Sequence, residues 1–91
     1  METHVQPVPA EYSAEERMAL LRLARATIEA ALATSEITVT APNQHLMEPR
    51  GVFTTLHLQG ALRGCIGSIE PRYPLWQTVQ ETSRAAAFED L

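Results

Sequence analysis

A helical spacing of apolar residues runs through the first third of the chain. Leucine, isoleucine and alanine recur there at three- and four-residue steps, while most charged residues fall on the other side. Ser13 and Glu16, at the start of this run, have the spacing of a capping box. The pattern predicts an amphipathic helix from Ala14 to about Ala33. Its apolar stripe fits a face that covers a sheet, with a partner-binding face as the alternative.

A second helical pattern ends the chain. The segment EPRYP is typical of a turn, and Pro74 is well placed in the first turn of a helix. Leu75, Val79, Ser83 and Ala86 then follow a helical step, while glutamine and charged residues face the other way. We predict a helix that ends near Phe88.

Between the helical stretches, GVFTTLHL and ALRGCIGSI alternate as two strands of a hairpin do. A two-residue type I′ loop would force Gln59 to a positive φ, whereas a three-residue loop of Leu58 to Gly60 places only the glycine there. We therefore predict the three-residue loop. In that register His57 pairs with Ala61, Thr55 with Arg63, Phe53 with Cys65 and Gly51 with Gly67.

The predicted register separates two faces of the hairpin. Val52, Leu56, Leu62 and Ile66 share one face, which we expect to be the core face. The other face carries a hydroxyl, an imidazole, a guanidinium and the thiol of Cys65. Such a mixture is unlike a core and like the wall of a site.

The remaining segments have weaker patterns. Residues 1–11, with Pro7 and Pro9, are expected to be an extended, loosely held lead-in. Thr34 to Arg50 holds one weak strand in EITVT at most, followed by a loop that is either functional or poorly ordered. The predicted fold class is α+β, an antiparallel sheet built on a central hairpin with two flanking helices, and residues 12–91 form the domain.

Composition excludes several classes of function. The 91 residues carry a net charge of −4, with no basic stripe for nucleic acid. All seven basic residues are arginines, which excludes enzymes that need a lysine, and the single aspartate, Asp90, makes a Ser-His-Asp triad very hard to build. We find no leader, no membrane span and no metal-binding spacing among His4, His45, His57 and Cys65, so we expect a cytoplasmic protein without metal or other cofactor.

Cys65 is the candidate catalytic residue, and three interpretations stay open for it. It could pack beneath Phe53, as buried cysteines commonly do, contact a ligand or redox partner, or act as a nucleophile. Arg63 lies two residues earlier, where it would lower the thiol pKa only modestly. His57 would be about 13 to 14 Å away along the predicted ladder, too far for a Cys-His dyad.

The candidate ligand-binding residues are Arg63, Gly64, Gly67 and Arg50. Two glycines in four strand residues mark a bulge or the close approach of a ligand or a second backbone. Arg50 and Arg63 could each hold a carboxylate or phosphate bidentately. The alternatives are a solvated charge for Arg50 and an ion pair with Glu70 or another acid for Arg63.

The stretches RGVFTTL, LRGCIGSIEP and AAAFED resemble the AMMECR-type domain family, known in bacteria and archaea as AmmeMemoRadiSam system protein A. The resemblance covers Tyr12 to Asp90 and corresponds to the first half of such a domain. It implies a two-lobed α and β fold around an antiparallel sheet, which this chain would hold incompletely. It also implies a functional segment at Arg63, Gly64, Cys65 and Gly67, and a Memo-like protein and a radical SAM enzyme as partners.

Two functions remain open at this point. The chain could be a binding or scaffold component that docks a partner on the glycine-containing strand. Alternatively it is an enzyme or enzyme subunit that uses Cys65 and Arg63 on a small anionic or electrophilic substrate. Self-association of an incomplete domain is a further expectation.

Overall fold

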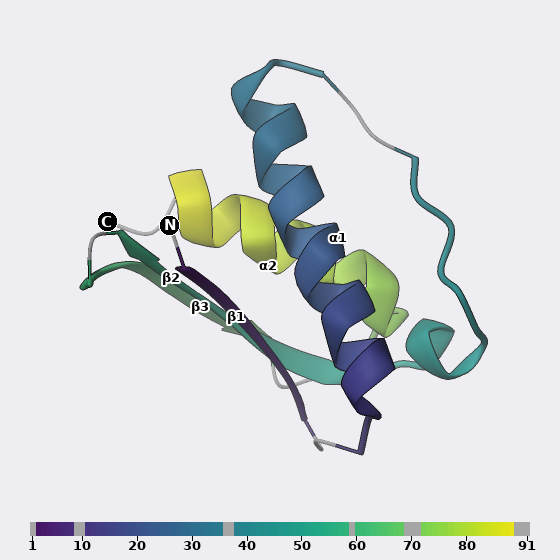
Figure 1. Cartoon of the computed structure of the whole chain (residues 1–91). Helices are drawn as coiled ribbons and strands as arrows, with labels where there is room; N and C mark the ends of the chain where they lie inside the picture. Colours follow the sequence, from purple (N-terminus) through teal and green to yellow (C-terminus); the bar gives the residue numbers. More distant parts are fainter. Residues whose placement is uncertain (1, 9–10, 36–37, 59, 69–71, 89–91) are drawn as a thin grey trace.

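Two helices cover one side of an antiparallel sheet in the computed structural model of the protein (Figure 1). The structure describes residues 2–8, 11–35, 38–58, 60–68 and 72–88. Its elements are β1 (Glu2–Val8), α1 (Ala14–Leu32), the 3-10 helix η1 (His45–Met47), β2 (Gly51–Leu58), β3 (Ala61–Ser68) and α2 (Leu75–Phe88). The predicted α+β fold class is confirmed.

Both predicted helices form close to their predicted bounds. Helix α1 begins after a complete capping box, in which the Glu16 amide donates to Ser13 Oγ at 3.1 Å and the Ser13 amide donates to Glu16 Oε1 at 3.0 Å. Helix α2 begins directly after Pro74. Neither α1 nor α2, the two α-helices of the described ranges, has the length and apolarity needed to cross a membrane.

The amino-terminal segment is a strand rather than the loosely held lead-in that we predicted. Within the described residues the sheet has the order β1-β2-β3, and β1 pairs antiparallel with β2 from Glu2–His57 to Val8–Gly51. Thr3, Val5 and Pro7 face the helices and the residues between them face away, so the side chains alternate between the two faces of the sheet. Pro7 is tolerated because β1 is an edge strand, where one side of the backbone needs no partner.

The hairpin register differs from the predicted one. Leu58 pairs with Ala61, so that only Gln59, which lies outside the described residues, and Gly60, at φ 83°, join the strands. The pairing shifts between Leu56 and His57, and Arg63 becomes the extra residue of a β-bulge on β3.

The bulge decides which face each β3 residue occupies. Beyond it Thr55 pairs with Cys65, and Phe53 with Gly67. This register is two residues away from the predicted one, so Cys65 keeps its predicted face. Before the bulge the offset is one residue, and Leu62 therefore leaves the predicted core face: its exposed fraction is 64%.

The core lies between the helices and the sheet. Helix α2 packs on β2 and β3, while α1 packs on α2 and β1. Predicted core residues Val52 and Leu56 are fully buried, and a hydrogen bond of 3.0 Å between Thr54 and Thr82 joins β2 to α2 inside the core. The larger of two clusters is made by Tyr12, Leu20, Leu23, Ala24, Leu46, Val52, Leu75, Trp76 and Val79.

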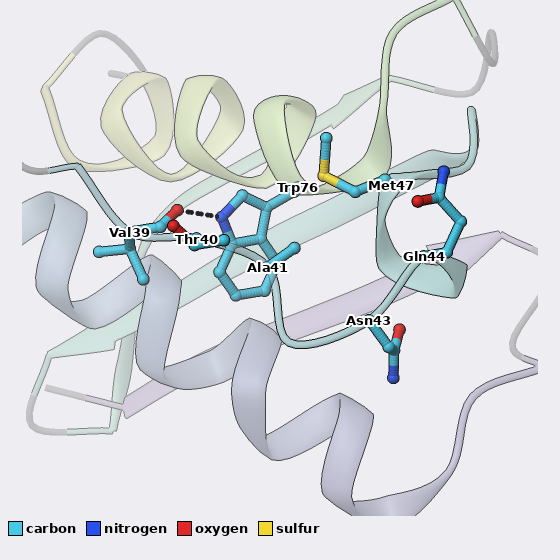
Figure 2. A pocket seen from close by; sticks show the side chains of 7 residues that line it. All are labelled: Val39, Thr40, Ala41, Asn43, Gln44, Met47 and Trp76. Atoms are coloured by element: carbon cyan, nitrogen blue, oxygen red, sulfur yellow. Dashed lines mark hydrogen bonds between the residues drawn. The ribbon is translucent and has the colours of Figure 1, made fainter.

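The connection from α1 to β2 passes outside the helices (Figure 1). Thr38–Thr40 form no strand, and Glu36 and Ile37 of the predicted weak strand lie outside the described residues. The indole of Trp76 donates a hydrogen bond of 2.8 Å to the Val39 carbonyl, which fixes this connection on α2 (Figure 2).

Candidate functional site on the open face of the sheet

On the side of the sheet away from the helices, three rows of residues run across all three strands β1, β2 and β3. We call this surface the open face, and it contains the predicted catalytic residue. The rows are Gln6–Phe53–Gly67, His4–Thr55–Cys65 and Glu2–His57–Leu62.

Cys65 lies in the middle row with its thiol exposed. Its Sγ is 3.4 Å from the hydroxyl oxygen of Thr55, the residue opposite it on β2. The core residues Val52 and Leu56 are buried on the helix side of the sheet, whereas Cys65 lies exposed on the other side. Cys65 is therefore not a core residue. Burial beneath Phe53, one of the three open interpretations, is thereby excluded.

His57 is closer to Cys65 than the predicted register allowed. His57 follows Thr55 by two positions on β2, so it is a diagonal neighbour of Cys65 on the same face. Diagonal neighbours of this kind have Cα atoms about 7–8 Å apart, within reach of long side chains. The predicted separation of 13 to 14 Å was wrong because it depended on the three-residue loop.

Gly64 points toward the helices. A Cβ atom at Gly64 would overlap the backbone carbonyl of Ala86 in α2. Two glycines in one strand predicted the close approach of a ligand or a second backbone. At Gly64 this neighbour is the backbone of α2. Arg63 occupies the bulge beside Gly64, and its side chain lies outside the described part of the chain.

Gly67, in contrast, lies on the open face beneath an aromatic ring. A Cβ atom at Gly67 would overlap the ring of Phe53, its partner on β2. Phe53 thus covers the strand backbone where the glycine leaves it bare. The ring remains 36% exposed.

Arg50 lies away from Cys65, at the residue before β2 begins. Its Nε donates a hydrogen bond of 2.7 Å to Glu11, its Nη2 lies 3.2 Å from Glu48, and its Nη1 donates to the Pro49 carbonyl at 2.8 Å. The hydrogen bond to Glu11 raises the pKa of the Arg50 guanidinium. The structure therefore does not bring Arg50 together with Cys65, and it shows this guanidinium holding two chain segments together.

A polar cluster next to Arg50 surrounds the start of α1. His45 stacks on Tyr12 with ring centroids 4.2 Å apart, and its Nδ1 lies 2.9 Å from Glu16 Oε2. The hydrogen bond from the Ser13 amide is the largest cause that lowers the pKa of Glu16 to about 2, and hydrogen bonds from His45 and Asn43 add to it. Burial raises the pKa of Tyr12.

A pocket of about 460 Å³ lies on the helix side of the molecule, between the α1–β2 connection and Trp76 (Figure 2). Val39, Met47 and Trp76 form its apolar wall. Asn43 also lines it, but its amide already donates to Glu16 and accepts from the Leu46 amide. Cys65 is on the opposite face of the sheet and takes no part in this pocket.

Sequence reasoning missed two contributors to the open face, Glu2 and His4. Both come from the segment that we expected to be loosely held. Polar residues alternate there with Thr3, Val5 and Pro7, and that two-residue alternation was the available signal of a strand.

Comparison with known proteins identifies the family. The model of the family described as AMMECR1 matches residues 21–91. The chain belongs to the AMMECR1 family. The resemblance that the segments RGVFTTL, LRGCIGSIEP and AAAFED indicated is therefore confirmed.

Several archaeal members of the AMMECR1 family are similar to this chain. Protein MJ0810 of Methanocaldococcus jannaschii is 41% identical over 78 residues, which are 84% of this chain and 39% of that protein. Protein NEQ441 of Nanoarchaeum equitans is 39% identical over 75 residues, 80% of this chain and 42% of that protein. Protein MK0488 of Methanopyrus kandleri is 43% identical over 79 residues, 84% of this chain and 38% of that protein. The chain thus spans about two fifths of the length of these relatives.

Proposed function

We propose that this AMMECR1-family chain is a binding or scaffold component, and that a protein partner docks on the open face beside β3. The exposed Leu62 at the edge of the sheet is the observation that carries this proposal. The partners that we propose, from the family resemblance, are a Memo-like protein and a radical SAM enzyme.

The open face has the mixed character of a docking surface. Leu62 and Phe53 supply exposed apolar contact area, and the polar side chains of Gln6, His4 and Thr55 lie between and beside them. Protein interfaces commonly combine aromatic and aliphatic anchors with polar groups in this way. A helix or loop of the partner could therefore rest on the face itself.

The β3 edge offers a second mode of contact. Edge strands of natural proteins are usually guarded by charged side chains, proline, β-bulges or short length, because their unpaired backbone groups can pair with another chain. β3 is eight residues long and contains no proline or lysine, and beyond its bulge at Arg63 the pairing is regular from Gly64 to Ser68. A partner strand could therefore add to the sheet at this edge.

The test is the affinity of the purified chain for a purified Memo-like protein and for a purified radical SAM enzyme from the same genome, measured by calorimetry. Leu62→Glu places a charge in the contact area, and we expect it to weaken binding at least tenfold, about 1.4 kcal/mol. Leu32→Glu is the matched control, because Leu32 is 66% exposed on α1, away from the open face. Equal binding by both variants would contradict the proposal, as would no binding of either partner to the unmodified chain.

The exposed thiol supports a second candidate function, an enzyme or enzyme subunit that uses Cys65 and Arg63 on a small anionic or electrophilic substrate. Thr55 lies within hydrogen-bond range of the sulfur, and His57 is its diagonal neighbour. Such surroundings can orient a thiol and accept its proton.

Iodoacetamide labelling at neutral pH tests this second candidate. A reactive Cys65 should be alkylated several times faster in the folded chain than in urea, and His57→Gln should slow the folded rate. Labelling no faster than in urea would count against thiol chemistry. A Cys65→Ser variant that keeps full affinity for the partner would then leave docking as the function.

A further inference from the structure

We infer that Glu2, His4 and His57 form a binding site for a divalent transition-metal ion, with Zn²⁺ as its simplest probe, at one end of the open face. This inference does not depend on the docking of a protein partner.

The geometry brings the three side chains together from two strands. Glu2 and His4 are two positions apart on β1, so they project from the same face, and His57 is the residue opposite Glu2 on β2. One potential ligand atom from each lies within 4.8 Å of the other two. The rings of His4 and His57 meet edge to face, with centroids 5.6 Å apart.

Small side-chain rotations would convert this cluster into a coordination sphere. Zinc bonds to nitrogen and oxygen are about 2.1 Å long, so tetrahedral ligand atoms are about 3.4 Å apart. Glu2 and His4 already approach to 3.6 Å, and their side chains are 75% and 53% exposed, which leaves them free to rotate.

His57 has a ring nitrogen that makes no hydrogen bond with the residues that the structure describes. This nitrogen, Nδ1, is also inaccessible to solvent. Buried ring nitrogens are normally satisfied. If the His57 ring rotated toward Glu2 and His4, one ring nitrogen could coordinate the metal and the other would leave its present surroundings.

The donor set indicates the class of ion. Two imidazoles and one carboxylate form the three-ligand set of many open zinc sites, in which water fills the remaining position. Imidazole favours zinc, copper and nickel over magnesium and calcium, which prefer oxygen ligands. The ion would also tie β1 to β2, so binding should stabilise the amino-terminal strand.

The experiment is a titration of the untagged, chelator-treated chain with Zn²⁺ in competition with a chromogenic zinc chelator. We expect one equivalent to bind, and each of His4→Gln, His57→Gln and Glu2→Gln to weaken the affinity at least tenfold. Glu2 is highly exposed, so Glu2→Gln tests the site without risk to folding. Circular dichroism establishes that the histidine variants are folded.

Two control variants separate this site from other donors. His45→Gln removes the histidine that stacks on Tyr12 beside α1, and Cys65→Ser removes the thiol. Both should bind Zn²⁺ with the affinity of the unmodified chain. In NMR spectra, Zn²⁺ should shift the imidazole signals of His4 and His57 and leave those of His45 in place.

Three results would overturn the inference. The first is a dissociation constant weaker than about 1 mM, which isolated surface histidines could produce. The second is unchanged affinity in Glu2→Gln together with either folded histidine variant. The third is a loss of binding in Cys65→Ser, which would place the ion on the thiol instead.

Discussion

At the scale of single residues, the two glycines of β3 show that one sequence signal can have two different causes. The spacing of Gly64 and Gly67 indicated a close approach without saying of what. In the structure a helix backbone lies against Gly64, and an aromatic side chain lies over Gly67. The neighbour at Gly64 is held by the rest of α2, whereas the ring of Phe53 can turn aside.

This difference predicts unequal effects of alanine at the two positions. Gly64→Ala forces the new methyl group against the Ala86 carbonyl, so α2 must move off β3, and we expect a loss of about 1–3 kcal/mol in the free energy of unfolding. Gly67→Ala should cost less than about 1 kcal/mol, because Phe53 can change rotamer. Urea denaturation of both variants measures the two losses. A Gly67→Ala loss as large as that of Gly64→Ala would show that Phe53 is as firmly held as α2.

At the scale of elements, the helices and the hairpin could be predicted, but the hairpin register could not. Ser13, Glu16 and Pro74 act locally, so their positions fix the helix starts. The bulge at Arg63 instead depends on contacts between distant segments, since it places Gly64 against α2 and leaves Cys65 on the open face. The three-residue loop was predicted from Gln59 and Gly60 alone, and those two residues carry no information about how β3 packs on α2.

The candidate site was predicted in part for the same reason. Cys65 was assigned to the correct face, because the true register lies an even number of residues from the predicted one. Glu2 and His4 were missed because their place on the open face follows from pairing with His57 and Thr55, more than fifty positions away. Strand pairing of that range is set by the packing of the whole sheet.

The role of β1 as part of the sheet leads to a prediction at two adjacent positions. Val5 packs against the core, whereas Gln6 projects from the open face. Val5→Glu would bring an unpaired charge toward the core, and we expect it to lower the free energy of unfolding by about 1–3 kcal/mol. Gln6→Glu should change it by less than about 0.5 kcal/mol. Equal small losses in thermal or urea unfolding would mean that β1 contributes little to the fold.

At the scale of the whole molecule, polar contacts join segments that are far apart in the chain. Glu16 at the start of α1 binds His45 of η1 and Asn43 of the preceding connection, and Arg50 before β2 binds Glu11. One end of the helix layer is thereby fixed to the end of the sheet farthest from the proposed metal site. Glu16 probes the start of α1 together with these contacts, because the hydrogen bond from the Ser13 amide, joined by those from His45 and Asn43, lowers its pKa to about 2.

The lowered pKa of Glu16 predicts how the stability of the fold depends on acid. The folded chain holds this carboxylate ionised to a lower pH than the unfolded chain does, so the unfolded state binds the proton first as the pH falls. The stabilisation is complete above the ordinary glutamate pKa and is lost as the pH approaches 2. Glu16→Gln should therefore unfold at a lower urea concentration than the unmodified chain at pH 6. Its stability should also decline less steeply between pH 5 and pH 2, the range between the ordinary pKa of glutamate and the lowered pKa of Glu16. Glu15→Gln removes a charge from the same turn of α1 and is the control for charge alone. If the two variants declined equally between those pH values, the capping box and the contacts of Glu16 with His45 and Asn43 would not stabilise the fold through its charge.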